Sequence, residues 1–434
     1  MALAHGICPY YLGQEISRWA DVVVADYNYY FDLSAMLYGL TLTHQWRVGV
    51  LVDEAHNLVE RGRRMYSAEL DQGLLQPLRR QLSPALKQPL DRLNRAWNEL
   101  NAEQVLDYQA SDVLPAAFMQ AVQRCVSALG DYFNENPRGT DAALQSFYFE
   151  LLHFVRIGEV FDAQFLYDCT LRAGKAGRAF SRLCLRNVVP AGFLAERFKA
   201  SRATVLFSAT LSPQRYYQDL LGLPADTPWV DVESPFKAEQ LQVRLIEHVS
   251  TRYPDRKASL APIAELIAEQ FAKRPGNYLA FFSSFEYLQQ AYAELAGRFP
   301  HVPLWAQERG MDEATRAAFI ERFQAGGQGV GFAVLGGAFG EGIDLPGERL
   351  IGAFVATLGL PQVNPVNEQI KQRMGVLFGA GHDYTYLYPG MQKVIQAAGR
   401  VIRTQQDSGV VMLIDDRFAA DKVRALFPGW WQVD

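Results

Sequence analysis

Several short runs of apolar residues along the chain end in small or polar residues. Continuous apolar runs, unlike alternating ones, indicate strands that are buried on both faces of a parallel sheet covered by helices. The runs lie at Asp21–Asn28, Val48–Glu54, Thr204–Thr210, Tyr278–Ser284, Gly331–Gly342, Leu350–Thr357 and Gly409–Asp416. This pattern predicts an α/β fold, in which ligands bind beyond the carboxyl ends of the strands.

The predicted strands fall into two groups, which indicates two sheets and three regions. Residues 1–60 together with 199–212 form a partial first lobe, and residues 213–434 form a second, complete lobe. Between them, residues 61–198 show no clear strand and carry Leu, Ala, Gln, Arg and aromatic residues at helical spacing. We therefore expect a helical insertion within the first lobe.

The composition is that of an ordinary globular protein and restricts the possible functions. The 434 residues carry a net charge of −5, so any site for nucleic acid must be a local groove. The four cysteines, at positions 8, 125, 169 and 184, show no C-x-x-C spacing, which argues against a zinc site or a disulfide framework. No apolar run is long enough to span a membrane. We expect a monomer in the reducing cytoplasm.

The run at Val48 leads directly into Asp53, Glu54, Ala55 and His56. Two adjacent carboxylates at the edge of an apolar core are costly unless a cation lies between them, which suggests magnesium bound to a nucleotide. The alternative is that Asp53 simply caps the start of a helix. Ser208 and Thr210 follow a second apolar run, and Gly337–Asp344 follow a third.

Near the end of the chain, Gln396, Arg400 and Arg403 are spaced at i, i+4 and i+7. On a helix they would share one face, and arginine is suited to bidentate contact with phosphate. The alternative is a solvated basic face. The apolar flanks, Gly399 and the buried strand that follows favour the phosphate interpretation.

The order of these motifs resembles that of superfamily 2 helicases, and more narrowly the DinG/XPD-type iron–sulfur DNA helicases. The resemblance covers essentially the whole chain. It is carried by the segments Cys8–Asp32, Val52–Leu58 (VDEAHNL), Phe207–Pro213, Glu233–Phe236, Ala280–Leu288, Phe339–Gly347 and Gln396–Val411. It implies two RecA-like lobes, with an arch-like domain in place of the insertion.

The resemblance implies a role for each residue at an ATP site. Asp53 would hold Mg²⁺, Glu54 would orient or deprotonate the attacking water, and His56 would couple the nucleotide state to the second lobe. Arg400 and Arg403 would stabilise transition-state charge. The remaining predicted nucleotide and coupling residues are Gln396, Glu341, Gly342, Asp344, Ser208 and Thr210; for the last two, loop capping is an equal alternative.

The same resemblance implies that single-stranded DNA, or DNA with a single-stranded tail, crosses both lobes. Tyr27, Asn28, Tyr29, Ser283 and Ser284 lie at the ends of predicted strands, on the side expected for DNA. The predicted function is therefore ATP-driven DNA translocation and unwinding, in repair or replication. Core packing is an alternative role for each tyrosine.

Two family features are absent from the sequence. It contains no G-x-x-x-x-G-K-[ST] phosphate loop, and Cys8 is the single cysteine that matches a cluster ligand. We therefore expect the C-terminal part of a longer helicase or a degenerate copy, which alone neither hydrolyses ATP nor binds a [4Fe–4S] cluster. Two alternatives stay open: a non-catalytic nucleic-acid-binding or scaffold protein, and another superfamily 2 ATPase acting on RNA.

Overall fold

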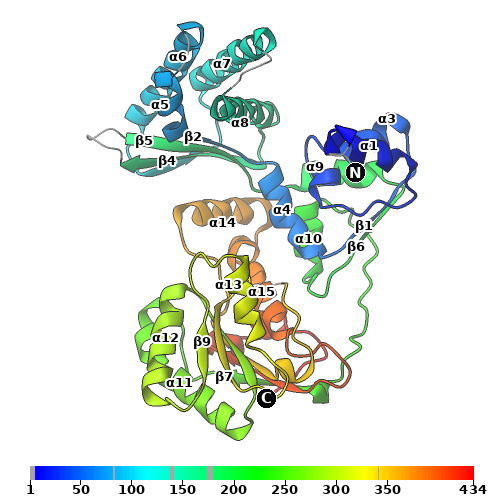
Figure 1. The fold of residues 1–434 in the computed structure, drawn as a ribbon, viewed down its shortest axis with the longest axis vertical. Coiled ribbons are helices and arrows are strands. Elements are labelled where there is room, and N and C mark those ends of the chain that lie inside the picture. The colour runs from blue at the N-terminus through cyan, green and yellow to red at the C-terminus, as the bar shows by residue number, and fades with distance from the viewer. Residues whose placement is uncertain (1–4, 82–83, 137–140, 174–178, 341) are drawn as a thin grey trace. The chain divides into compact units, whose positions relative to one another are not determined.

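The computed structural model describes residues 5–81, 84–136, 141–173, 179–340 and 342–434. The chain divides into two compact units, Met1–Thr227 and Pro228–Asp434. Each unit contains a parallel sheet with helices beside it (Figure 1), so the predicted α/β class is confirmed.

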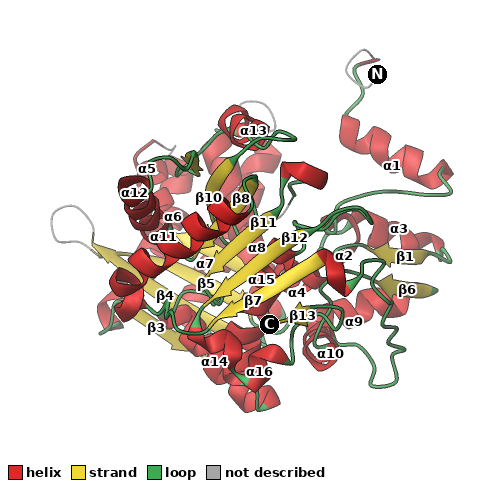
Figure 2. Ribbon diagram, turned by 90° about the horizontal axis from the view of Figure 1, so that it is seen from below, coloured by secondary structure: helices red, strands yellow, loops and turns green. Residues whose placement is uncertain are grey.

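The second unit is built on a sheet of seven parallel strands in the order β13-β7-β12-β11-β8-β10-β9. Figure 2 shows its central strands running side by side. The strands are β7 (Leu241–Ile246), β8 (Asn277–Phe282), β9 (Leu304–Ala306), β10 (Gly329–Val334), β11 (Gly352–Ala356), β12 (Gly409–Ile414) and β13 (Gln432–Val433). Four of the predicted apolar runs overlap the central strands β8, β10, β11 and β12.

Helices cover both faces of this sheet, which explains the continuous apolar runs. In β8, Leu279 and Phe281 face one hydrophobic core, whereas Tyr278, Ala280 and Phe282 face the other. Because successive side chains of a strand point to opposite faces, both sets must be apolar. The core that Tyr278 faces includes residues of α11 (Arg256–Lys273) and α12 (Phe285–Arg298). The core that Leu279 faces includes residues of α13 (Glu313–Glu321) and α15 (Tyr388–Ala398). The unit also contains α14 (Pro365–Phe378) and α16 (Asp421–Arg424).

The first unit contains a two-stranded parallel sheet that carries the DEAH sequence. In this sheet β1 (Gly49–Val52) pairs with β6 (Ala203–Leu206), with Val52 opposite Leu206. The helices of this part are α1 (Pro9–Trp19), α2 (Asn28–Phe31), α3 (Met36–His44), α4 (Leu58–Met65), α9 (Ala191–Ala200) and α10 (Gln214–Leu221). The α10 helix belongs to this unit because it packs against α4 and α9, although the sequence analysis placed it in the second lobe.

The strand predicted at Asp21–Asn28 is wrong. The segment is irregular, and Val22 and Val24 are 80% and 95% exposed. A strand needs a neighbour to accept and donate its backbone hydrogen bonds, and no strand in the described part of the chain pairs with this segment. Local apolar composition was therefore a poor guide here.

The prediction that the insertion is purely helical is also wrong. It contains an antiparallel sheet in the order β2-β5-β4-β3, with helices packed beside it (Figure 1). Its elements are β2 (Ala68–Asp71), α5 (Gln72–Gln81), α6 (Pro84–Glu103), β3 (Tyr108–Ser111), α7 (Ala116–Glu135), α8 (Ala142–Glu159), β4 (Phe165–Ala173) and β5 (Ala179–Asn187).

Polar residues within these strands hid them from pattern analysis. Asp168 in β4 and Arg186 in β5 form an ion pair, with 2.8 Å between Arg186 Nε and Asp168 Oδ2. The side chain of Asp168 is 3% exposed, so a charged residue occupies a position normally apolar in a strand.

Among the described residues, no helix is long and apolar enough to cross a membrane.

The carboxyl end of β12 is fixed by a buried carboxylate, which gives a stability prediction. Asp415 is fully buried and accepts hydrogen bonds from Arg417 and Thr251. Burial raises its pKa, but these hydrogen bonds outweigh burial and lower the pKa from 3.8 to about 2. A lowered pKa in the folded state means that the charged form stabilises the fold above pH 4 and that this contribution is lost toward pH 2.

We expect Asp415→Asn to lower the free energy of unfolding at pH 7 by on the order of 2 kcal/mol and to flatten its pH dependence between about pH 4 and pH 2. Asp416→Asn, at the exposed neighbour that pairs with Arg252, is the matched control and should change stability little. Denaturant unfolding at several pH values measures the free energy of unfolding of both variants. Equal acid sensitivity in Asp415→Asn and wild type would contradict this account.

Candidate nucleotide and nucleic-acid sites

The DEAH residues form a tight turn at the carboxyl end of β1. Glu54 adopts a left-handed backbone conformation, with φ 48° and ψ 41°, which costs a non-glycine residue free energy. The Ala55 N–H donates to the carbonyl of Phe207 at 3.1 Å, so the turn is joined to the end of β6. Asp53 does not cap a helix: its Oδ1 accepts from the Glu54 N–H at 2.7 Å. The simple capping alternative is therefore excluded.

His56 links the DEAH turn to the residues after β6. Its buried ring places Nδ1 2.6 Å from Ser208 Oγ and 3.2 Å from Glu54 Oε2. Burial lowers the pKa of His56, and the charges of Glu54 and Asp53 act in the opposite direction. His56 is therefore neutral at pH 7. The structure thus brings together three residues that the sequence analysis assigned to coupling and catalysis.

Thr210 lies beside this group. Its N–H donates to Ser208 Oγ at 3.1 Å, and its own side chain is buried. Its Oγ1 has no hydrogen-bond partner in the part of the chain that the structure describes. The loop-capping alternative thus accounts for the Ser208–Thr210 contact, whereas the contact between Ser208 and His56 goes beyond it.

Tyr27 supports the DEAH turn, a role that the sequence analysis missed. Its hydroxyl donates to the carbonyl of Asp53 and, at 2.9 Å, to that of Glu54. Burial, together with the charges of Glu54 and Asp53, raises the pKa of Tyr27 to about 12. Tyr27 therefore stays protonated and able to donate. Asn28 and Tyr29 are exposed at the start of α2, so their predicted contact with DNA stays a prediction.

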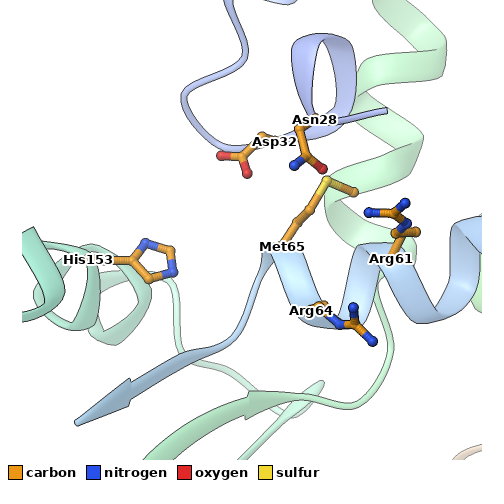
Figure 3. Close-up of a pocket in the computed structure, with 6 residues that line it drawn as sticks. All are labelled: Asn28, Asp32, Arg61, Arg64, Met65 and His153. Carbon is orange, nitrogen blue, oxygen red and sulfur yellow. The ribbon is translucent and has the colours of Figure 1, made fainter. Parts of the chain in front are cut away.

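A cavity of about 230 Å³ lies in the first unit (Figure 3). Arg61, Arg64 and Met65 of α4 line it from one side, Asn28 and Asp32 from another, and His153 of α8 from the insertion. The signal in the sequence was the pair of arginines at i and i+3 in RGRR, which the sequence analysis passed over. The nearest carboxylate to Arg61 is Asp26, at 3.7 Å.

In the second unit, the predicted arginine helix is wrong in detail. Helix α15 ends at Ala398, so Arg400 and Arg403 lie in the loop that follows and not on one helical face with Gln396. The loop turns away because the Asp407 carboxylate accepts from the Arg403 and Thr404 N–H groups, at 2.7 and 2.8 Å. Glycine at position 399 also disfavours continuing the helix.

The two arginines nevertheless converge on the predicted glycine-rich loop. Arg400 Nη1 donates to the carbonyl of Ile343 at 2.9 Å, and Arg403 Nη2 donates to the same oxygen at 3.2 Å. Asp344 is 3.3 Å from Arg403 Nε, with its own side chain 76% exposed. Gly342 has φ 79°, which favours glycine at that position. Glu341, predicted to contact the nucleotide, lies outside the described residues.

Ser283 and Ser284 follow β8, as predicted. The Ser284 hydroxyl accepts from the Tyr287 N–H at 3.2 Å and caps α12. The Ser283 hydroxyl accepts from Arg256 Nη2 at 2.9 Å. Arg256 was not singled out from the sequence because it begins a helix far from any recognisable motif. The capping role of Ser284 is structural, and its predicted contact with DNA stays a prediction.

The residues fit one implied cofactor and not the other. Asp53 and Glu54 are exposed oxygen donors at a strand end, which suits Mg²⁺. An iron–sulfur cluster does not fit: Cys8 is exposed, whereas Cys125, Cys169 and Cys184 are buried in the insertion. Burial raises the pKa of Cys125 to about 12, which opposes the thiolate form. Within the described ranges, no three His, Cys, Asp or Glu side chains are grouped to hold a metal.

Comparison with known proteins places this chain among helicases. The family described as "Helicase C-terminal domain" matches residues 267–434, and the family described as "DEAD_2" matches residues 1–75. A "Probable ATP-dependent helicase" of Methanocaldococcus jannaschii is 31% identical over 49% of this chain and 34% of its own length. "ATP-dependent helicase DinG" of Mycobacterium tuberculosis is 28% identical over 59% of this chain and 39% of its own length.

A solved XPD helicase structure has the same fold, with a TM-score of 0.63 and 18% identity over 98% of this chain and 74% of that chain. Family matches at both ends of the chain, in the order of the DEAH and arginine motifs, are those of a helicase. Together with the similarity to DinG, they support a superfamily 2 helicase of the DinG/XPD type. It spans 34% and 39% of the length of the two curated relatives above.

The contact between Glu54 and His56 gives a direct prediction. The Glu54 charge raises the pKa of His56 against the larger effect of burial, so Glu54→Gln should lower that pKa further. NMR titration of the imidazole signals measures it, with His56→Asn used to assign the resonance among seven histidines. Glu60→Gln, at an exposed carboxylate paired with Arg64, is the matched control. An unchanged or raised His56 pKa in Glu54→Gln would show that the two side chains do not interact in solution.

Proposed function

We propose that this chain carries part of the machinery of an ATP-driven DNA translocase that unwinds duplex DNA, in repair or replication. The observation that supports it most is the contact between the DEAH turn and Ser208, made through the buried and neutral His56. A nucleotide-dependent enzyme needs such a link, because hydrolysis at Glu54 must alter residues outside the ATP site. The proposed cofactors are ATP and Mg²⁺.

The roles of the DEAH residues follow from their positions. Asp53 would hold the metal ion, usually through water, and the ion would neutralise charge that develops on the phosphates. Glu54 orients the attacking water and accepts its proton, and its carboxylate is kept in place by the left-handed turn and by His56. Tyr27 holds the carbonyls of both carboxylate residues and so fixes the turn.

Arg400 and Arg403 act on the phosphates in this proposal. Their guanidinium groups are already positioned by the Ile343 carbonyl, so little side-chain freedom is lost when an anion is bound. Asp344 and Gly342 contact the nucleotide or relay its state, and Gln396 lies four residues before Arg400. The substrate is single-stranded DNA or DNA with a single-stranded tail, bound by a monomer in the cytoplasm.

A non-catalytic DNA-binding role is the second candidate. The sequence contains no phosphate-loop motif, and in-line positioning of the phosphates is most of phosphoryl-transfer catalysis. The two candidates, and the RNA-dependent alternative, differ in whether hydrolysis occurs and in which nucleic acid stimulates it.

We expect the 434-residue chain alone to show no DNA-stimulated ATP hydrolysis, and a version extended upstream to include a phosphate loop to show it. The reason is the missing cradle of backbone N–H groups and lysine. A coupled ATPase assay with single-stranded DNA and RNA measures both proteins, and Glu54→Gln is the inactive control. Hydrolysis by the short chain that Glu54→Gln abolishes would show that another segment holds the phosphates. An inactive extended version that still binds DNA would favour the non-catalytic role.

In the hydrolysing version, Arg400→Ala and Arg403→Ala should each reduce turnover by roughly 10³-fold while changing ATP affinity less. Lysine should not rescue either position, because it lacks the planar fork that contacts the Ile343 carbonyl and phosphate together. Steady-state kinetics with separate measurement of ATP binding tests this. Near-normal turnover in both alanine variants would show that these arginines have only a structural role.

A further inference from the structure

Arg256 contacts two tyrosine rings at the carboxyl edge of the second sheet. Its guanidinium carbon is 5.2 Å from the ring centre of Tyr253 and 5.2 Å from that of Tyr287. The two rings differ in exposure: Tyr287 is buried, whereas Tyr253 is 78% exposed. The cation is thus fixed against the core on one side and supports a solvent-facing aromatic ring on the other.

The same guanidinium group orients Ser283. Arg256 can only donate, so the Ser283 hydroxyl must accept the 2.9 Å hydrogen bond from Nη2. The hydroxyl proton of Ser283 is therefore directed away from Arg256 and is available to an acceptor. Arg256 Nε is buried without a hydrogen-bond partner in the described part of the chain, so the guanidinium group is held by its contacts with the two tyrosine rings and by the Ser283 hydrogen bond.

A second cation–aromatic pair involves Phe285 and Arg309. The guanidinium carbon of Arg309 is 5.3 Å from the ring centre of Phe285, two residues after Ser283. Nearby Arg252 differs, because its charge is neutralised by Asp416 at 2.5 Å. Alternating cations and aromatic rings along one edge are typical of surfaces that bind single-stranded nucleic acid.

We infer that Tyr253, Arg256 and Ser283 form one nucleotide subsite for single-stranded DNA: Tyr253 stacks on a base, Ser283 donates to the adjoining phosphate, and Arg256 positions both. This inference rests on the proposed function. It adds which residue contacts the base and which contacts the DNA backbone. Arg309 supplies positive charge to the next phosphate along the strand. Stacking on the Tyr253 ring does not distinguish one base from another, because every base has an aromatic face, so the subsite accepts every base.

The test compares two ligands with the full 434-residue chain: fluorescent oligothymidylate, and an abasic oligomer of equal length and charge. Tyr253→Ala should weaken binding of oligothymidylate by roughly five-fold to a hundred-fold, because a base stack is lost. Its binding of the abasic oligomer should not change, which a merely structural defect would not reproduce. Tyr253→Phe should retain wild-type affinity, and Phe149→Ala, at an exposed ring of α8, is the matched control.

The proposed contacts with the DNA backbone are tested with variants of Ser283, Arg309 and Arg256. Ser283→Ala should weaken both ligands, and Arg309→Ala should also reduce the slope of log affinity against log salt by about 1. Because Arg256 acts through Ser283, the loss in the double alanine variant should be smaller than the product of the two single losses. Multiplicative losses would overturn the positioning role of Arg256.

The outcomes separate this inference from the function on which it rests. If wild type binds oligothymidylate but Tyr253→Ala binds both ligands as wild type does, the subsite is wrong and the proposed DNA binding stands. Equal weakening of both ligands by Tyr253→Ala also overturns base stacking. If the wild-type chain binds neither oligomer, both the subsite and the proposed DNA binding by this chain are overturned.

Discussion

The pairing of β1 with β6 is the constraint on which the candidate ATP site depends. It brings Glu54 to 3.5 Å from Ser208 although 154 positions separate them in the sequence. The hydrogen bond from Ala55 to Phe207 extends this pairing past the strand ends, and His56 completes it with side-chain contacts. The insertion leaves the chain after the DEAH turn and returns before β6, so the pairing of the two strands holds the ends of this long connection together.

This arrangement explains why some features were predictable from the sequence and others were not. Strands β8, β11 and β12 are apolar on both faces because helices cover both, so their sequences are unambiguous. Strands β4 and β5 are antiparallel and satisfy polar residues such as Asp168 and Arg186 by pairing them with each other, which composition alone does not reveal. The segment at Val22 has the composition of a strand and lacks a partner.

The candidate site shows the same division. The motif order predicted that Asp53, Glu54, His56 and Ser208 belong together, and the structure brings them into contact. The helical-face argument for Arg400 and Arg403 failed because α15 ends at Ala398, and Asp407 then accepts hydrogen bonds from the N–H groups of Arg403 and Thr404 in the loop. Tyr27 and Arg256 were missed in their positioning roles because each acts through a contact distant in sequence, on the Asp53 and Glu54 carbonyls and on Ser283.

The left-handed conformation of Glu54 has a consequence for how this protein can change. A side chain at φ 48° costs about 1 kcal/mol or more relative to glycine, which adopts this conformation freely. Variants selected only for thermal stability should therefore accumulate glycine or asparagine at position 54, whereas variants selected for turnover should keep glutamate. At position 54, a gain in stability therefore comes with a loss of activity, and the residue found there indicates which of the two properties was under selection.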